Sequence, residues 1–231
     1  MTHSLISPEA LWQAPAGAAL VASAHGALEV IVDRPEPASA APCGLALVAH
    51  PQPLLGGSAR HKVPQVLARG LAEAGWLALR PNFRGVGRST GAHAGGEGEA
   101  EDLLALAQAL RAAGPGAPLA LVGFSFGAHV TARVAAALAA GGQAAQAVVL
   151  AGMPDGVVPA GRAYDSPGSF DGELVLHGAA DEVVPLPLAL AWARRHDKAV
   201  TVLPEADHFF AGQLPLLRRL VVRHVAAAVP P

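Results

Sequence analysis

The chain has 231 residues, of which 52% are apolar and 4% aromatic, and its formal net charge is −2. It has no basic block of the kind that binds nucleic acid, and no apolar run reaches the roughly 18 residues of a transmembrane helix. The single Cys43 excludes an internal disulfide and fits a reducing compartment. The N-terminal residues lack the basic start of a secretory signal. We therefore expect a globular, cytoplasmic protein that binds neither nucleic acid nor membrane.

Short apolar runs alternate with longer segments of helical periodicity along the whole chain. Residues 1–25 are expected to form an N-terminal arm with a first strand over 18–23, which pairs in a hairpin with 28–33. A surface loop rich in Pro and Ala follows over 33–44. Further strands are expected over 45–50, 76–83, 118–123, 147–152, 173–178 and 199–204. Helices are expected over 62–75, 98–114, 128–141, 187–196 and 214–229.

This alternation of strand and helix predicts the α/β class, with a doubly wound, mostly parallel sheet and helices on both of its faces. No linker, repeat or shift in composition divides the chain, so residues 1–231 are expected to form one domain. Ligand sites in such sheets form at the carboxyl ends of the strands. The polar residues that follow each strand are therefore the candidates for chemistry.

The pentapeptide GFSFG, residues 123–127, lies between a predicted strand and an alanine-rich predicted helix. A nucleophile elbow requires this strand–turn–helix setting, with Ser125 at the sharp turn. The flanking glycines suit a turn in which a Cβ would collide with the strand or the helix. A serine is also a common helix cap, and the pentapeptide alone leaves both interpretations open.

A serine nucleophile needs a general base, and the strand ends offer three histidines. His208 follows the last predicted strand and lies downstream of Ser125, which favours it as the base. His50 and His177 also end strands, and we interpret His177 as a structural turn residue. The other histidines of the chain lie in helices, in loops or in the N-terminal arm.

A carboxylate must orient the imidazole of the base and stabilise its charged form. Asp181 follows the predicted strand over 173–178, and Asp155 on the preceding strand is the rival acid. Asp207 is too close in sequence to His208 to orient it easily. The chain order Ser125, Asp181, His208 is the order in which α/β-hydrolase triads occur.

An oxyanion formed on the substrate needs two N–H donors. One would be the amide of Phe126, directly after the nucleophile, and the other should come from the loop HPQPLLGG over 50–57. Pro51 and Pro53 have no N–H, so Gln52 is the donor that this tripeptide can offer. The two prolines would also stiffen the loop. The alternative interpretation is a rigid surface loop without a role in catalysis.

With these residues, the chain resembles the small, lidless bacterial α/β-hydrolases near the dienelactone-hydrolase and carboxylesterase-like branches. The matching stretches are GALEV (26–30), HPQPLLGG (50–57), NFRGVGRSTG (82–91), GFSFGA (123–128), LHGAADEVVP (176–185) and ADHFFAGQL (206–214). The resemblance implies Ser125 as nucleophile, Asp181 as acid, His208 as base, and the amides of Gln52 and Phe126 as the oxyanion hole.

The chain departs from these families at a few positions. Relatives often have HPHP where this chain has HPQP, and often have Asn where His61 stands. Dienelactone hydrolases proper use Cys where Ser125 stands. These departures concern the substrate rather than the triad.

Two further motifs receive structural interpretations. RGVGRS (84–89) lacks the glycine order of a nucleotide loop and is interpreted as a turn, with Arg84 in a structural ion pair. Four acids are interpreted as a solvated helix start, because His and acidic residues do not cluster at metal-ligand spacing; these acids are Glu97, Glu99, Glu101 and Asp102.

The sequence thus predicts a serine hydrolase that cleaves carboxylic esters or thioesters of small molecules through an acyl-enzyme, without cofactor or metal. About twenty residues separate the strands over 147–152 and 173–178, too few for a helical lid, so the site should be open. Two alternatives remain: an inert scaffold used for binding, and C–C hydrolase or perhydrolase chemistry on the same triad. The sequence does not indicate an oligomeric state.

Overall fold

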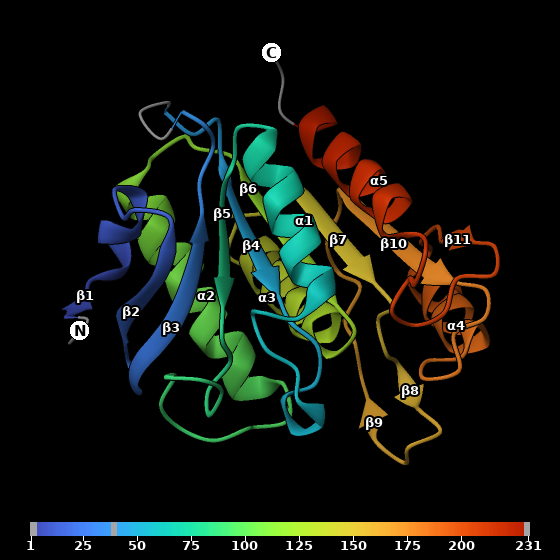
Figure 1. Cartoon of the computed structure of the whole chain (residues 1–231). Helices are drawn as coiled ribbons and strands as arrows, with labels where there is room; N and C mark the ends of the chain where they lie inside the picture. The colour runs from blue at the N-terminus through green and yellow to red at the C-terminus, as the bar shows by residue number, and fades with distance from the viewer. Residues whose placement is uncertain (1–3, 38–40, 229–231) are drawn as a thin grey trace.

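The computed structural model describes residues 4–37 and 41–228 of the chain (Figure 1). Residues 1–3 of the expected N-terminal arm, 38–40 of the expected surface loop and 229 of the last expected helix lie outside the described residues.

Within the described ranges, the main sheet has nine strands in the order β1-β2-β3-β5-β4-β6-β7-β10-β11 (Figure 1). Their bounds are β1 (Leu5–Ile6), β2 (Gly17–Ser23), β3 (Gly26–Asp33), β4 (Leu45–Ala49), β5 (Leu77–Pro81), β6 (Leu119–Phe124), β7 (Ala147–Ala151), β10 (Glu173–Gly178) and β11 (Thr201–Leu203). From β5 to β11 every neighbouring pair is parallel. Helices connect these strands along the chain except between β7 and β10, where a longer connection without a helix makes the crossover. The predicted mostly parallel sheet is confirmed.

The predicted hairpin at the start of the sheet is also present. Strands β2 and β3 pair antiparallel along their whole length, from Gly17 opposite Val32 to Ser23 opposite Gly26. Strand β3 then pairs antiparallel with β5, which joins the hairpin to the parallel part of the sheet.

Helices cover both faces of the sheet (Figure 1). Helices α1 (Lys62–Glu73) and α5 (Leu214–Ala227) lie on one face, and α2 (Glu97–Ala113), α3 (Phe126–Ala140) and α4 (Leu186–His196) pack against the other. Strands β4 and β6 are buried at every position, which explains their uninterrupted apolar sequences. Alanine at many core positions lets helix and sheet approach closely, and Trp76 and Trp192 fill larger spaces, one in each of the two cores.

The prediction of a solvated start for α2 is wrong for two of its four acids. The Glu99 side chain is fully buried. Its two carboxylate oxygens accept hydrogen bonds from the backbone N–H groups of Ala94 (2.9 Å) and Gly96 (2.8 Å), which compensate for the loss of water. Asp102 is buried against Arg84, whose Nε donates to it at 2.8 Å. The structural ion pair expected for Arg84 is therefore present, and its partner is one of these acids.

Besides the short strand β1, which pairs parallel with β2, three further short elements were not predicted from the sequence. Two are 3₁₀ helices, η1 (Pro8–Trp12) and η2 (Pro53–Leu55). The third is a small antiparallel hairpin, β8 (Gly156–Val157) with β9 (Ala163–Tyr164), in the connection between β7 and β10. No helix forms in the described residues of this connection, in agreement with the expected absence of a lid.

Candidate active site

Ser125 stands at the sharp turn between β6 and α3, with φ 55° and ψ −126°. This is a strained backbone conformation for a residue other than glycine. A Cβ on Gly123 would lie 2.5 Å from the Cα of Ala128, and one on Gly127 would lie 2.5 Å from the carbonyl oxygen of Ala49. Both flanking glycines are therefore required by close backbone approach, as the sequence predicted.

The Ser125 side chain does not cap the helix that it precedes. Its Oγ lies 2.8 Å from Nε2 of His208, and Nδ1 of His208 lies 2.7 Å from the Asp181 carboxylate. The three side chains come from the loops after β6, β11 and β10, and all three are buried. The structure thus brings together the three residues expected from their positions at the strand ends.

The Asp181 carboxylate is fixed from both sides. One oxygen accepts hydrogen bonds from the backbone N–H groups of Val183 (2.9 Å) and Val184 (2.7 Å), which leaves the other for His208. Because a carboxylate accepts hydrogen bonds, His208 donates through Nδ1–H, and its bare Nε2 can accept the hydroxyl proton of Ser125. This is the tautomer that a general base requires.

His177 braces the same loop, which agrees with its interpretation as a structural residue. Its buried Nε2 donates to the carbonyl oxygen of Val184 at 2.8 Å and lies 3.5 Å from the Asp181 carboxylate. Burial lowers the pKa of His177, so the neutral ring is favoured in the fold.

The rival acids are engaged elsewhere. Asp155 accepts a hydrogen bond from the backbone N–H of Ser166 (3.1 Å) and one from the guanidinium of Arg195 (2.8 Å). Asp207 accepts a hydrogen bond from the backbone N–H of Ala211 at 2.9 Å, in the turn that leads to α5.

The loop after β4 lies against the start of α3. The approach is so close that a Cβ on Gly127 would meet the carbonyl oxygens of both Ala49 and His50 at 2.5 Å. His50 fixes this loop: its Nδ1 donates to the Pro51 carbonyl oxygen (2.7 Å), and its Nε2 accepts from the Phe83 N–H (3.0 Å). Burial lowers the pKa of His50 to about 4, and the neutral ring is the form that can make both hydrogen bonds.

Gln52 follows in this loop and lines the same cavity as Ser125. Its side chain is held by two hydrogen bonds: Oε1 accepts from the Leu54 N–H at 3.4 Å, and Nε2 donates to the Tyr164 hydroxyl at 3.3 Å. Phe126 is the first residue of α3, where a backbone N–H has no acceptor within the helix. The two amides expected to form an oxyanion hole therefore belong to neighbouring backbone segments.

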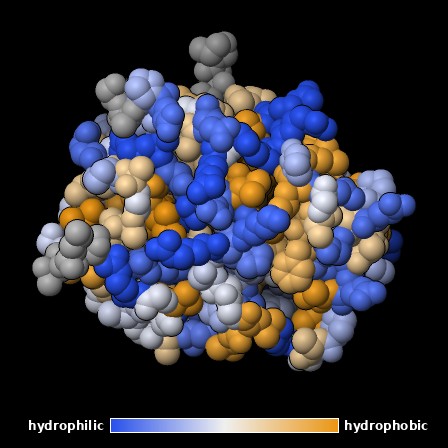
Figure 2. Space-filling model, in the orientation of Figure 1, coloured by the Kyte–Doolittle hydropathy of each residue, from blue (hydrophilic) through white to orange (hydrophobic). Residues whose placement is uncertain are grey.

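The cavity beside Ser125 has a volume of about 140 Å³. Its lining is mostly apolar, with a few polar groups, and consists of Pro51, Gln52, Leu55, Gly57, His61, Ser125, Pro154, Val158, Arg162, Tyr164, Val183, Val184, His208 and Phe209. Three of these lining residues are exposed apolar side chains, namely Leu55, Val183 and Phe209. Figure 2 shows apolar surface along the lower edge of the molecule, near η2 and the β8–β9 hairpin.

His61 also lines this cavity. In the sequence it stood out only as a position at which related chains often have Asn. Its ring stacks on Phe124 at 5.7 Å between centroids, and its Nδ1 accepts a hydrogen bond from the Val63 N–H at the start of α1. Burial and the nearby His208 lower the pKa of His61. The sequence signal that could have identified His61 is its position directly before the predicted helix over 62–75, where a side chain can cap the helix.

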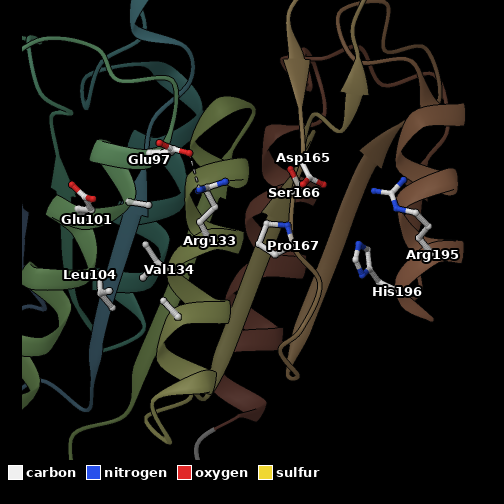
Figure 3. A pocket seen from close by; sticks show the side chains of 12 residues that line it. Glu97, Glu101, Leu104, Arg133, Val134, Asp165, Ser166, Pro167, Arg195 and His196 are labelled. Atoms are coloured by element: carbon white, nitrogen blue, oxygen red, sulfur yellow. Dashed lines mark ion pairs between the residues drawn. The ribbon is translucent and has the colours of Figure 1, made fainter.

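A larger cavity, of about 660 Å³, lies apart from these residues, between α2, α3, α4 and the segment 165–167 (Figure 3). Arg133 points toward Glu97 across it, at 3.6 Å, and Arg195 is paired with Asp155. The cations in its wall already have anionic partners, and none of the residues expected to be catalytic lines it. Among the described residues, no group of three or more His, Cys, Asp or Glu side chains could hold a metal ion.

Comparisons with known proteins agree with the fold. The family model of the alpha/beta hydrolase fold matches residues 54–168. A crystal structure of an α/β serine hydrolase without a lid from Xanthomonas campestris is 36% identical, with a TM-score of 0.81 over 94% of this chain and 98% of that one. A serine hydrolase homologue from Coxiella burnetii is 34% identical, with a TM-score of 0.74 over 89% of this chain and 95% of that one.

An uncharacterized protein of Rickettsia prowazekii is 42% identical over 87 residues. The match spans 37% of this chain and 37% of that curated relative.

The chain belongs to the α/β-hydrolase fold family, and over nearly its whole length it is similar to a serine hydrolase without a lid and to a serine hydrolase homologue. The resemblance stated from the sequence is confirmed. In the part of the chain that the structure describes, no helix is both long and apolar enough to span a membrane.

Proposed function

We propose that the protein is a serine hydrolase that cleaves carboxylic esters or thioesters of small molecules through an acyl-enzyme. The observation that carries this proposal is the continuous chain of hydrogen bonds from Ser125 through His208 to Asp181, with distances of 2.8 and 2.7 Å. A nucleophile, a base and an orienting acid are the three parts that acyl transfer to a hydroxyl requires.

In the first step, Nε2 of His208 takes the Ser125 proton while Oγ attacks the substrate carbonyl carbon. Asp181 stabilises the imidazolium that results. The tetrahedral intermediate then collapses, and His208 gives the proton to the leaving alcohol or thiol. Water, deprotonated by His208, hydrolyses the acyl-enzyme and restores the Ser125 hydroxyl.

The backbone amides of Gln52 and Phe126 would stabilise the oxyanion of each tetrahedral intermediate. The fixed position of the loop after β4 supports this role, because donors that are already in place need no reorganisation during the reaction. His50 and the prolines on either side of Gln52 provide that rigidity.

A small, mostly apolar cavity and the short connection between β7 and β10 favour small substrates that enter an open site. The mechanism uses only side chains and backbone amides of this chain, so we propose that it needs neither cofactor nor metal.

Labelling with a fluorophosphonate tests the proposal. The reagent should form one covalent adduct, and peptide mass analysis should locate it on Ser125. A panel of esters and thioesters of increasing acyl length would then identify the substrate class. A purified, folded protein without an adduct would favour an inert scaffold used for binding.

A further inference from the structure

Arg162 lies in the β8–β9 hairpin, and its side chain lines the cavity that also contains Ser125 and His208. The rest of the described lining is apolar or neutral, apart from histidines. Arg162 therefore contributes the one permanently charged side chain among the described residues that form this cavity.

The guanidinium of Arg162 has no partner in the described part of the chain. Arg162 as a whole is half-buried, but its Nε is buried and makes no hydrogen bond to any described residue. Arg133 and Arg195, by contrast, pair with Glu97 and Asp155. A buried donor on a cation is costly to leave unpaired, so its retention in a cavity points to an acceptor that arrives from outside.

The hairpin holds Arg162 in a defined place. The Arg162 carbonyl oxygen accepts a hydrogen bond from the Val158 N–H at 2.9 Å, and Gly161 makes the turn with φ 78°. Tyr164, two residues further on, accepts a hydrogen bond from the Gln52 side chain at 3.3 Å. The cation is therefore tied to the loop that carries the expected oxyanion donor.

We propose that Arg162 is a specificity-determining residue that binds an anionic group, such as a carboxylate, on the substrate of this site. The inference rests on the proposed function and narrows it to esters or thioesters that carry a negative charge close to the scissile bond. The planar guanidinium matches the geometry of a carboxylate, which it can bind through two parallel hydrogen bonds. The exposed apolar side chains around the cavity would contact the uncharged part of the molecule.

Two matched pairs of esters test this proposal and identify the side of the bond that bears the charge. For the acyl side, the pair is 4-nitrophenyl hydrogen succinate and its methyl ester. For the alcohol side, the pair is 4-acetoxybenzoate and its methyl ester. The measured quantity is the ratio of kcat/KM for the anionic ester to kcat/KM for its neutral counterpart.

Arg162→Met should lower this ratio at least about tenfold in one pair, the size expected for charge-assisted hydrogen bonds. Arg162→Lys, which keeps the charge but loses the planar fork, should lower it less. Arg223→Met is the matched control, because it removes the same charge from an exposed position on α5 and should keep the wild-type ratio. An unchanged ratio in Arg162→Met for both pairs would overturn the proposal.

A binding measurement separates this inference from the proposed reaction. Ser125→Ala, with and without Arg162→Met, is titrated by NMR with monomethyl succinate, dimethyl succinate, 4-hydroxybenzoate and methyl 4-hydroxybenzoate. Preference for an anion that Arg162→Met abolishes would support the inference even if the wild type hydrolysed no ester. Equal affinity for the charged and uncharged compounds would contradict it even if hydrolysis were efficient.

Discussion

The interaction of Asp181 with His208 determines which nitrogen of the imidazole can accept a proton. Asp181→Asn would present an amide that can donate to Nδ1 and so favour the wrong tautomer, with an expected loss on the order of 10⁴ in kcat. Asp155→Asn is the control, because Asp155 binds Ser166 and Arg195 rather than the imidazole. Both variants are compared at equal folded fraction, measured by circular dichroism. A larger loss in Asp155→Asn than in Asp181→Asn would mean that Asp155 is the acid that orients His208, contrary to this account.

The backbone N–H of Gln52, and not its side chain, is expected to act in catalysis. Gln52 has φ −51°, which proline can adopt, so Gln52→Pro removes the N–H without demanding a new backbone conformation. The expected cost is about 10²–10³ in kcat, as for loss of one oxyanion donor.

Gln52→Ala keeps the N–H and loses only the contacts to Tyr164 and Leu54, so its kcat should fall less than about tenfold. Fluorophosphonate labelling of both variants controls for access, because the proline ring also occupies the place of the N–H. Equal losses in the two variants would show that the side chain is the working group. If kcat were nearly unchanged in both variants, the second oxyanion donor would lie elsewhere, and the amides of Gly56 and Gly57 would be the next to test.

At the scale of elements, the approach of α3 to β4 brings the elbow and the oxyanion loop together. A Cβ on Gly127 would lie 2.5 Å from the carbonyl oxygens of Ala49 and His50, which are backbone atoms that cannot rotate away. Gly127→Ala should therefore lower the free energy of unfolding by about 1–3 kcal/mol, the usual cost of overpacking.

Gly141→Ala at the other end of α3 is the matched control, because its nearest neighbours would be 3.5 Å away and its φ is −83°. Urea unfolding followed by circular dichroism measures both variants. Similar stability of Gly127→Ala and the wild type would mean that α3 and β4 can separate freely, contrary to this account.

At the scale of the whole molecule, two buried histidines make stability depend on pH. Burial lowers the pKa of both His50 and His129 to about 4, so the fold keeps them neutral. In the unfolded chain a histidine titrates near about 6.5 and binds a proton first as the pH falls. Stability is therefore complete above about pH 6.5 and is lost as the pH falls toward 4.

His129→Gln tests this dependence outside the proposed catalytic residues. Each buried histidine should cost the wild type about 2 kcal/mol of unfolding free energy between pH 7 and pH 5. Glutamine does not titrate, so the variant should lose about 2 kcal/mol less than the wild type over the same interval. Urea unfolding at the two pH values gives the difference. Identical pH dependence of both proteins would show that His129 is already protonated in the fold or is not buried.

The sequence was sufficient to predict the parallel sheet and the positions of Ser125, Asp181 and His208, because uninterrupted apolar strands and their ends are local features. It was not sufficient for the burial of Glu99, whose carboxylate meets two backbone N–H groups and the His93 ring only in the folded chain. Arg162 and Tyr164 were also missed, because their hairpin has two-residue strands without a hydrophobic period. Their proximity to Ser125 depends on how that hairpin folds back over the strand ends.

The rate of ester hydrolysis by Ser125→Ala is the most direct measurement of the central claim that Ser125 is the nucleophile. The substrate should be the ester that the wild type hydrolyses best, and the variant should retain the circular dichroism spectrum and the unfolding midpoint of the wild type. Loss of the nucleophile from an intact triad is predicted to lower kcat on the order of 10⁶-fold. A kcat equal to that of the wild type would contradict the account.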